Sequence, residues 1–343
     1  MVTTVRQCRR SRNRLLQVRR LASRKPAHDF VNLLFETSVK RLQRETKMAV
    51  TMMSQDWLTR SGFAEPSQPG NISELCRNEE AEVIEFLSAR PLHTVFMMGL
   101  IRDNGLLSPK NRGSFYGSRS HAGQLEAVAL IGHATVVEAH TENSLIAVAR
   151  VARNCQNAHL IRGEQESVNV FWTYYAGAGS QPRCVTRERL FELSETPATV
   201  EGVELRPATM ADLEKVVAVN SSMAREEAGS NPLQRDPNGF RQRTGRRIGQ
   251  NRVWVLIQDN RLIFKADVVS ATPQVAYLEG IYVHPEERRQ GHALRCLTQL
   301  SSILLADTKS ICLTVNDLNK SAVALYEKVG FKFHSNYETI YLR

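Results

Sequence analysis

Long hydrophobic runs are missing from this sequence, which excludes one broad class of protein. No stretch approaches the roughly 20 consecutive apolar residues that a helix needs to cross a bilayer. The most apolar segments, His93–Ile101 and Ala127–Gly132, are short enough to be core elements. With 42% hydrophobic and 23% charged residues, the composition is that of a water-soluble globular protein. We therefore expect no membrane partner.

Paired cysteines and metal-ligand spacings are also missing. The nine histidines form no His-Glu-x-x-His pattern, and the six cysteines form no Cys-x-x-Cys pair. These cysteines are scattered along the chain, at Cys8, Cys76, Cys155, Cys184, Cys296 and Cys312. We expect neither a metal site nor a disulfide framework, and a reducing, cytoplasmic setting fits best.

An excess of basic residues is confined to the N-terminal segment. Residues 1–47 hold 13 basic and 3 acidic residues, which accounts for the whole formal charge of +10 and leaves 32 of each sign elsewhere. This segment could be an Arg-rich targeting sequence, an arm for nucleic acid or the ribosome, or a disordered leader upstream of the functional start. Because no aromatic residues are interleaved with the basic ones, the sequence favours the leader, and nucleic acid is not expected as a partner.

The length of 343 residues predicts two domains behind the leader. Residues 1–70 form the basic leader and end in the turn-rich segment Ser61–Asn71. The N-terminal domain then covers residues 71–199, and the C-terminal domain covers residues 200–343. Between them, Ser194–Gly202 contains Pro197 and reads as a joint.

Both predicted domains contain strands and helices in a similar order. In the first we expect helices at 79–90, 94–103, 142–153 and 166–175, and strands at 125–131, 134–139, 158–162 and 184–192. In the second we expect helices at 211–227, 291–306 and 319–329, and strands at 203–206, 252–258, 262–269, 276–283, 310–315 and 337–342. This order predicts an α/β fold with a mixed, partly parallel sheet and a degenerate duplication. The polar segment Arg225–Arg247 is expected to be a mobile flap over the acceptor.

The most informative stretch is a strand, a polar loop and a helix between Tyr277 and Leu304. The helix begins near Gly291 and carries leucines at 294, 297, 300 and 304, so that one apolar face packs on the sheet. Its N-terminus presents unpaired N–H groups and a partial positive charge, which together favour phosphate. Gly291 lets the backbone approach an anion closely, and Arg288 and Arg289 add positive charge. The pattern suits a pyrophosphate.

These residues resemble a known family. Arg288-Arg-Gln-Gly-His-Ala293 fits the Arg/Gln-x-x-Gly-x-Gly/Ala signature of the GNAT N-acetyltransferases, which holds the pyrophosphate of acetyl-CoA. Asn319-Lys-Ser-Ala-Val-Ala-Leu-Tyr-Glu-Lys-Val-Gly-Phe331 is similar to the family's second motif, whose Asn caps a helix and contacts the pantetheine arm. The resemblance implies the GNAT acyl-CoA N-acyltransferase fold, here as a tandem of two GNAT-like halves. The N-terminal half lacks the signature and is degenerate.

The resemblance also implies which residues bind acetyl-CoA and which carry out the chemistry. It assigns the donor to the backbone of Ile281 and Val283 and to a set formed by Arg288, Arg289, Gln290, Gly291, His292, Ala293 and Asn319. Glu279 corresponds to the family's general base, and Tyr326 to the tyrosine that protonates the leaving thiolate. As alternatives, Glu279 is a surface carboxylate, and Tyr326 is a packed aromatic residue.

The function implied is direct transfer of an acetyl group from acetyl-CoA to a primary amine of a small-molecule or amino-acid-like acceptor. We expect one acetyl-CoA per chain, no metal, and a monomer or homodimer. Two alternatives stay open. One is an acyl-CoA-binding regulatory module without turnover, and the other is a ribosome- or nucleic-acid-associated protein acetylase that uses the basic tail.

Overall fold

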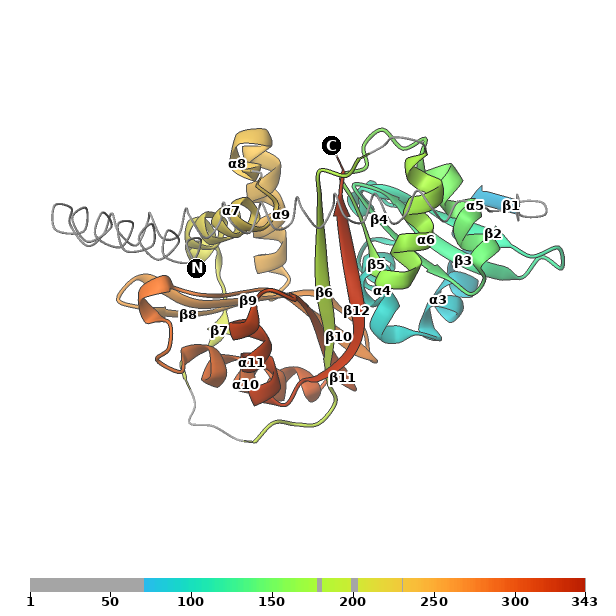
Figure 1. Ribbon diagram of the computed structural model, residues 1–343. Coiled ribbons are helices and arrows are strands. Elements are labelled where there is room, and N and C mark those ends of the chain that lie inside the picture. Colours follow the sequence, from blue (N-terminus) through green and yellow to red (C-terminus); the bar gives the residue numbers. More distant parts are fainter. Residues whose placement is uncertain (1–70, 178–180, 199–202, 230, 343) are drawn as a thin grey trace, which may run out of the picture. The chain divides into compact units, whose positions relative to one another are not determined.

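The N-terminal half begins on an edge strand and ends on a long strand in the middle of the sheet. The computed structural model describes residues 71–177, 181–198, 203–229 and 231–342 (Figure 1), so the predicted leader lies outside the described residues. The elements of this half are β1 Asn71–Glu74, α3 Glu80–Ser88, α4 Pro91–Asn104, β2 Gly113–Arg119, β3 Leu125–Gly132, β4 Ala134–Ala139, α5 Glu142–Ala152, β5 Leu160–Glu164, α6 Gln165–Ala176 and β6 Cys184–Leu193.

The C-terminal half repeats this order with one additional helix. Its elements are β7 Arg206–Pro207, α7 Leu213–Ala228, α8 Pro232–Arg235, α9 Pro237–Gly249, β8 Val253–Gln258, β9 Arg261–Ala271, β10 Val275–Val283, α10 His292–Leu305, β11 Ser310–Asn316, α11 Lys320–Val329 and β12 Lys332–Tyr341. The segment 225–247, which the sequence predicts to be a mobile flap, is mostly helical in α7, α8 and α9, and its mobility stays a prediction. Strands β1 and β2 were not predicted, and β12 begins five residues earlier than expected.

All the described strands form one sheet of twelve, in the order β1-β2-β3-β4-β5-β12-β6-β11-β10-β9-β8-β7. The pairs β4–β5 and β10–β11 are parallel, and the remaining neighbours are antiparallel. Counted from β1 or from β7, the order of antiparallel and parallel pairs is the same. This confirms the expected mixed α/β sheet built from two similar halves.

The two halves exchange their last strands. β6 belongs to the N-terminal half but pairs with β11, and β12 belongs to the C-terminal half but pairs with β5. The side chains follow the backbone, since Phe191 of β6 is buried in the core with Leu297 and Val323, while Ile340 of β12 is buried with Val148 and Phe171. Residues 65–343 accordingly form one compact unit.

In the C-terminal half the alternation of side chains along each strand separates two helical layers. Val255 of β8 packs in the cluster formed with α7 and α9, whereas the next residue, Leu256, packs in the cluster formed with α10 and α11. Figure 1 shows α7, α8 and α9 on one side of these strands and α10 and α11 on the other. The end of β10 and the start of α10 thus lie between the two layers.

Candidate active site

Strand β10 separates from β11 and bulges next to the backbone that the family resemblance assigns to the donor. The parallel ladder with β11 ends at Leu278 and Leu313, although β10 continues to Val283. Against β9, Glu279 pairs with Asp267 and Tyr282 with Lys265, so the bulge contains Gly280 and Ile281. Such a bulge redirects backbone groups away from the ladder.

Glycine at position 280 makes this bulge possible. Gly280 has φ +61°, and a Cβ there would lie 2.8 Å from the Lys265 Nζ. Lys265 is fully buried, and its Nζ lies 2.8 Å from Asp267 Oδ1. The bulge therefore rests on a buried ion pair and has no room for a larger residue.

The loop after β10 leads into an open helix start. Gly291 is the N-cap of α10 with φ +81°, and a Cβ there would meet nothing within 4 Å. The first backbone bond of α10 runs from Arg295 N to Gly291 O, so the N–H groups of His292 and Ala293 precede the helical ladder. No acidic residue occupies the first turn. This helix start fits a pyrophosphate.

The side chains of the loop are arranged around that start. Arg288, Arg289 and Gln290 are exposed; Arg288 Nε donates to the Val283 carbonyl at 3.3 Å, and Gln290 donates back to the Glu286 carbonyl. His292 is buried, so its contribution to an anion site is its backbone N–H. Arg289 and the exposed face of Arg288 are the cations available to a phosphate.

The helix of the second motif is capped at both ends as the sequence predicts. Asn319 Oδ1 accepts from the Ala322 N–H at 3.1 Å, and Gly330 ends α11 in the left-handed region with φ 114°. Tyr326 is 7% exposed and its ring lies between Phe191 and Phe331, at centroid distances of 6.3 and 6.0 Å. Tyr326 is thus a packed aromatic residue, whatever further role its hydroxyl has.

The candidate base Glu279 lies in a network of charged and polar side chains. Its Oε1 accepts hydrogen bonds from the Arg162 guanidinium, at 2.8 Å, and from the Tyr277 hydroxyl. The other arm of Arg162 donates to the Thr314 hydroxyl, and its Nε lies 3.4 Å from Glu188 Oε2. Burial raises the pKa of Glu279, but Arg162 and Tyr277 outweigh it, so this pKa lies below its ordinary value. Glu279 is therefore a carboxylate at neutral pH, with 38% of its side chain exposed.

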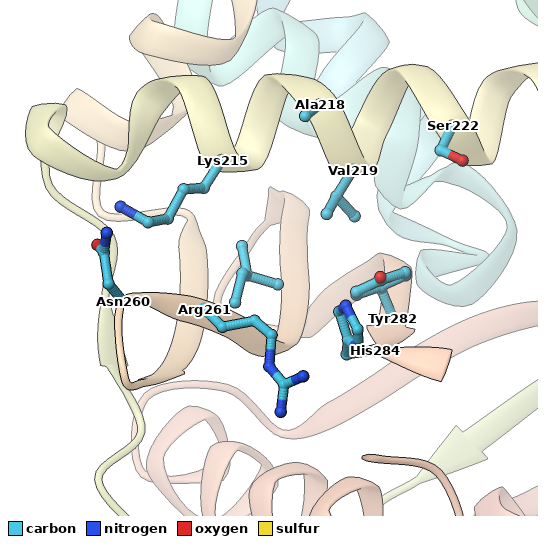
Figure 2. Close-up of a pocket in the computed structure, with 9 residues that line it drawn as sticks. Lys215, Ala218, Val219, Ser222, Asn260, Arg261, Tyr282 and His284 are labelled. Atoms are coloured by element: carbon cyan, nitrogen blue, oxygen red, sulfur yellow. The ribbon is translucent and has the colours of Figure 1, made fainter. Parts of the chain in front are cut away.

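A separate pocket lies further along the same strand (Figure 2). It has a volume of about 380 Å³ and lies between α7 and the β8–β9 hairpin. Figure 2 shows α7 above it and Asn260, Arg261, Tyr282 and His284 below. Its lining contains no carboxylate and none of the predicted site residues; it is formed by Lys215, Ala218, Val219, Ser222, Asn260, Arg261, Leu262, Tyr282 and His284.

The equivalent place in the N-terminal half has a different chemistry. The parallel ladder of β4 and β5 also ends early, at Val136 and Arg162, but Arg90 bridges the strands beyond it through Glu138 and Glu164, at 3.0 and 2.7 Å. The following helix α5 is capped by the Thr141 hydroxyl and has an acid, Glu142, in its first turn. A capped and acidic helix start disfavours an anion.

Two further properties were tested on the described part of the chain. Over those ranges, no group of three or more His, Cys, Asp or Glu side chains is arranged to hold a metal ion. No helix there is both long and apolar enough to span a membrane.

Comparison with known proteins gives one family match, over part of the chain. Residues 222–331 match the acetyltransferase (GNAT) family. No curated protein matches the sequence. Over these residues the match agrees with the resemblance that the motifs predicted, and the family's acyl donor is acetyl-CoA.

Solved structures share the fold over most of the chain. A GNAT-family acetyltransferase from Colwellia psychrerythraea covers 80% of this chain and 100% of its own, at 13% identity and a TM-score of 0.52. A Drosophila protein covers 80% and 99%, at 12% identity and a TM-score of 0.58. A GCN5-related N-acetyltransferase from Sphaerobacter thermophilus covers 80% and 96%, at 11% identity and a TM-score of 0.51. At these identities the likeness concerns the fold alone.

Sequence reasoning missed Arg162. It lies in the strand predicted at 158–162, and no further role was predicted for it. No local pattern signals its contact with Glu279, because the two residues are 117 positions apart and belong to different halves.

Proposed function

We propose that this protein is an N-acetyltransferase that transfers the acetyl group of acetyl-CoA directly to a primary amine of a small-molecule or amino-acid-like acceptor. The observation that carries the proposal is the open start of α10 at Gly291, directly after the bulged end of β10. The end of β10 has an unpaired edge on the side of β11, and the helix start that can hold phosphate follows it in the chain. This arrangement suits a donor with a pyrophosphate and an extended arm.

The donor residues that we propose are those that the family resemblance assigns. The backbone N–H groups of Gly291, His292 and Ala293 hold the pyrophosphate, together with the side chains of Arg288 and Arg289. Gln290 contributes through the backbone of the same loop. The main chain of Ile281 and Val283 aligns the pantetheine arm, and Asn319 meets it at the start of α11. Bound acetyl-CoA supplies an activated thioester. The capped, acidic start of α5 supports one donor per chain.

The chemical roles follow from the reaction. The acceptor ammonium loses a proton to the Glu279 carboxylate, directly or through a water molecule. The amine nitrogen forms a bond to the acetyl carbon while the carbon–sulfur bond breaks, and the Tyr326 hydroxyl donates a proton to the leaving sulfur. The nitrogen then releases its second proton, which restores the Tyr326 hydroxyl. In this arrangement Glu279 Oε1 is occupied by Arg162 and Tyr277, so Oε2 is the acceptor of the proton.

The test is a screen of primary amines with acetyl-CoA, read by release of free CoA thiol and by the mass of the product. Wild-type protein is expected to acetylate at least one class of amine, and a Glu279→Gln, Tyr326→Phe double variant is expected to lose this activity while it still binds acetyl-CoA. Full activity of the double variant would refute these roles.

A binding module without turnover is the alternative. If Glu279 and Tyr326 had only structural roles, Glu279 Oε1 would still accept its two hydrogen bonds and Tyr326 would still be packed. Saturable acetyl-CoA binding together with no acetylation of any amine in the screen would favour this module. The third candidate, a ribosome- or nucleic-acid-associated acetylase, depends on residues 1–47, which lie outside the described residues.

A further inference from the structure

We propose that Arg162, a residue of the N-terminal half, is a positioning residue for the chemistry of the C-terminal half: it fixes Glu279 so that Oε2 faces the acceptor amine. This inference rests on the proposed function. It makes the active site composite, because the GNAT domain alone lacks this arginine.

The first step is the geometry of the two guanidinium arms. One arm donates to Glu279 of β10, and the other donates to Thr314 of β11. These two residues directly follow Leu278 and Leu313, the last pair of the β10–β11 ladder. Arg162 therefore bridges the strands at the point where they separate, and it replaces the missing backbone ladder with a side chain of fixed planar shape.

The second step is that Arg162 is itself held. Its Nε lies 3.4 Å from Glu188 Oε2 on β6, and that carboxylate accepts from the Thr339 hydroxyl of β12 at 2.8 Å. β6 and β12 are the exchanged strands, so the contact depends on the way the halves interlock. With 23% of its side chain exposed, Arg162 is screened less by solvent than a surface arginine.

The third step is what remains free. Within the described residues, Oε2 of Glu279 makes no hydrogen bond or ion pair, while Oε1 takes two. A carboxylate held through one oxygen presents the other in a defined direction. Arg162 thus does for Glu279 what an orienting residue does for a general base.

The N-terminal half offers a comparison. There Arg90 bridges Glu138 and Glu164, and all three residues belong to that half. In the C-terminal half the bridging arginine comes from the other half. Loss of Arg162 is therefore expected to affect catalysis without removing any residue of the GNAT domain.

The experiment compares Arg162→Met and Arg162→Lys with wild type in the full chain. For Arg162→Met we expect kcat to fall about 10–100-fold, since a misplaced catalytic group costs about that much, with unchanged acetyl-CoA affinity by calorimetry. Because Arg162 favours the charged form of Glu279, its removal raises the pKa of that carboxyl. The acidic limb of the kcat/KM profile then moves to higher pH. Arg162→Lys keeps the positive charge but loses the two-armed guanidinium. The acidic limb of its kcat/KM profile should therefore return closer to the wild-type position than its kcat does to the wild-type value.

Arg119→Met is the matched control. Arg119 also binds two carboxylates, Glu79 and Glu82, and its side chain is 21% exposed, but all three residues lie in the N-terminal half away from β10. It should leave kcat and the pH profile as in wild type. If Arg162→Met shows wild-type kcat and an unmoved acidic limb, the positioning role is wrong.

A measurement without turnover separates this inference from the proposed function. Carbon-13 NMR of glutamate-labelled protein, with Glu279→Gln for assignment, follows the Glu279 carboxyl directly. A rise of its pKa in Arg162→Met supports the contact even if no amine is acetylated, and an unchanged pKa overturns it. If the pKa of Glu279 rises in Arg162→Met as expected but wild type acetylates no amine, the proposed function is contradicted and the contact is not.

Discussion

Glu279 combines two features that a general base requires, namely a charged state at neutral pH and an accessible oxygen. Its low pKa has a cost, because a weakly basic carboxylate has less driving force to take a proton. The contacts of Arg162 and Tyr277 therefore favour position over basicity. The same contacts mean that the carboxylate proposed as the base depends on neighbours in strands of both halves.

The first prediction concerns this carboxylate. Glu279→Gln keeps the shape of the side chain and removes the base, so kcat should fall about 10²–10⁴-fold, while acetyl-CoA affinity stays at the wild-type value. Steady-state kinetics and calorimetry measure the two quantities. Glu214→Gln is the control, since Glu214 is an exposed carboxylate of α7 that pairs with Arg241. Wild-type kcat in Glu279→Gln would remove Glu279 from the mechanism.

At the scale of elements, the two helices of the motifs start in opposite ways. α10 has an uncapped start that is available to an anion, whereas α11 is capped by Asn319. Asn319→Ala should lower the free energy of unfolding by about 1 kcal/mol through the lost cap. Urea denaturation measures this loss. No change in stability would contradict a stabilising cap, and the proposed contact with the donor would then be the remaining role of Asn319.

The start of α7 gives a prediction with a pH dependence. Asp212 accepts from Arg206 at 2.8 Å and from the Thr209 N–H at 2.8 Å, and these bonds lower its pKa to about 2. Its contribution to stability is present above the ordinary aspartate pKa and is lost as the pH falls toward about 2.

Asp212→Asn should therefore lower the free energy of unfolding at pH 7 by about 1–2 kcal/mol, allowing for the solvent around Arg206. Denaturation at pH 7 and at pH 3 measures the difference. The gap between variant and wild type should be smaller at pH 3, and a gap that grows on acidification would contradict the assigned ion pair.

The sequence predicted the elements that carry strong periodicity and missed those that do not. The helix of Leu297 and Leu300 and its Gly291 start were predicted because apolar spacing and turn chemistry are local. α9 was missed because Gly239 and Gly245 lower its helix propensity, although Asp236 caps it by accepting from the Gly239 N–H at 2.9 Å. Strand β2, Gly113–Arg119, was missed because it contains glycine, serine and arginine.

At the scale of the whole chain, the exchange of β6 and β12 could not be predicted. The alternation in each strand indicates that a strand forms, but it does not specify the neighbour with which that strand pairs. The Arg162–Glu279 contact follows from this pairing and was beyond reach for the same reason. Local motifs predicted the donor loop and Glu279 as site residues, and the topology adds the contact of Arg162 with Glu279 on which our proposal rests.

The exchange predicts that the halves are not independent. Phe191 and Ile340 each fill the core of the opposite half, so fragments 1–198 and 203–343 should each fail to give a cooperative unfolding transition alone. Co-expressed, they should associate and unfold in one transition. Circular dichroism during thermal denaturation measures this, and a cooperative transition in either isolated fragment would contradict the interlocked fold.

The most direct test of an acetyl-CoA site at the start of α10 is calorimetric titration of acetyl-CoA into wild type, Gly291→Trp and Gly123→Trp. Both glycines have left-handed φ, of +81° and +82°, and both have nothing within 4 Å of an added Cβ, but Gly123 lies in a remote turn. We expect one-to-one binding in wild type and Gly123→Trp, and none in Gly291→Trp. Equal binding by all three proteins, or no binding by wild type, would contradict the site.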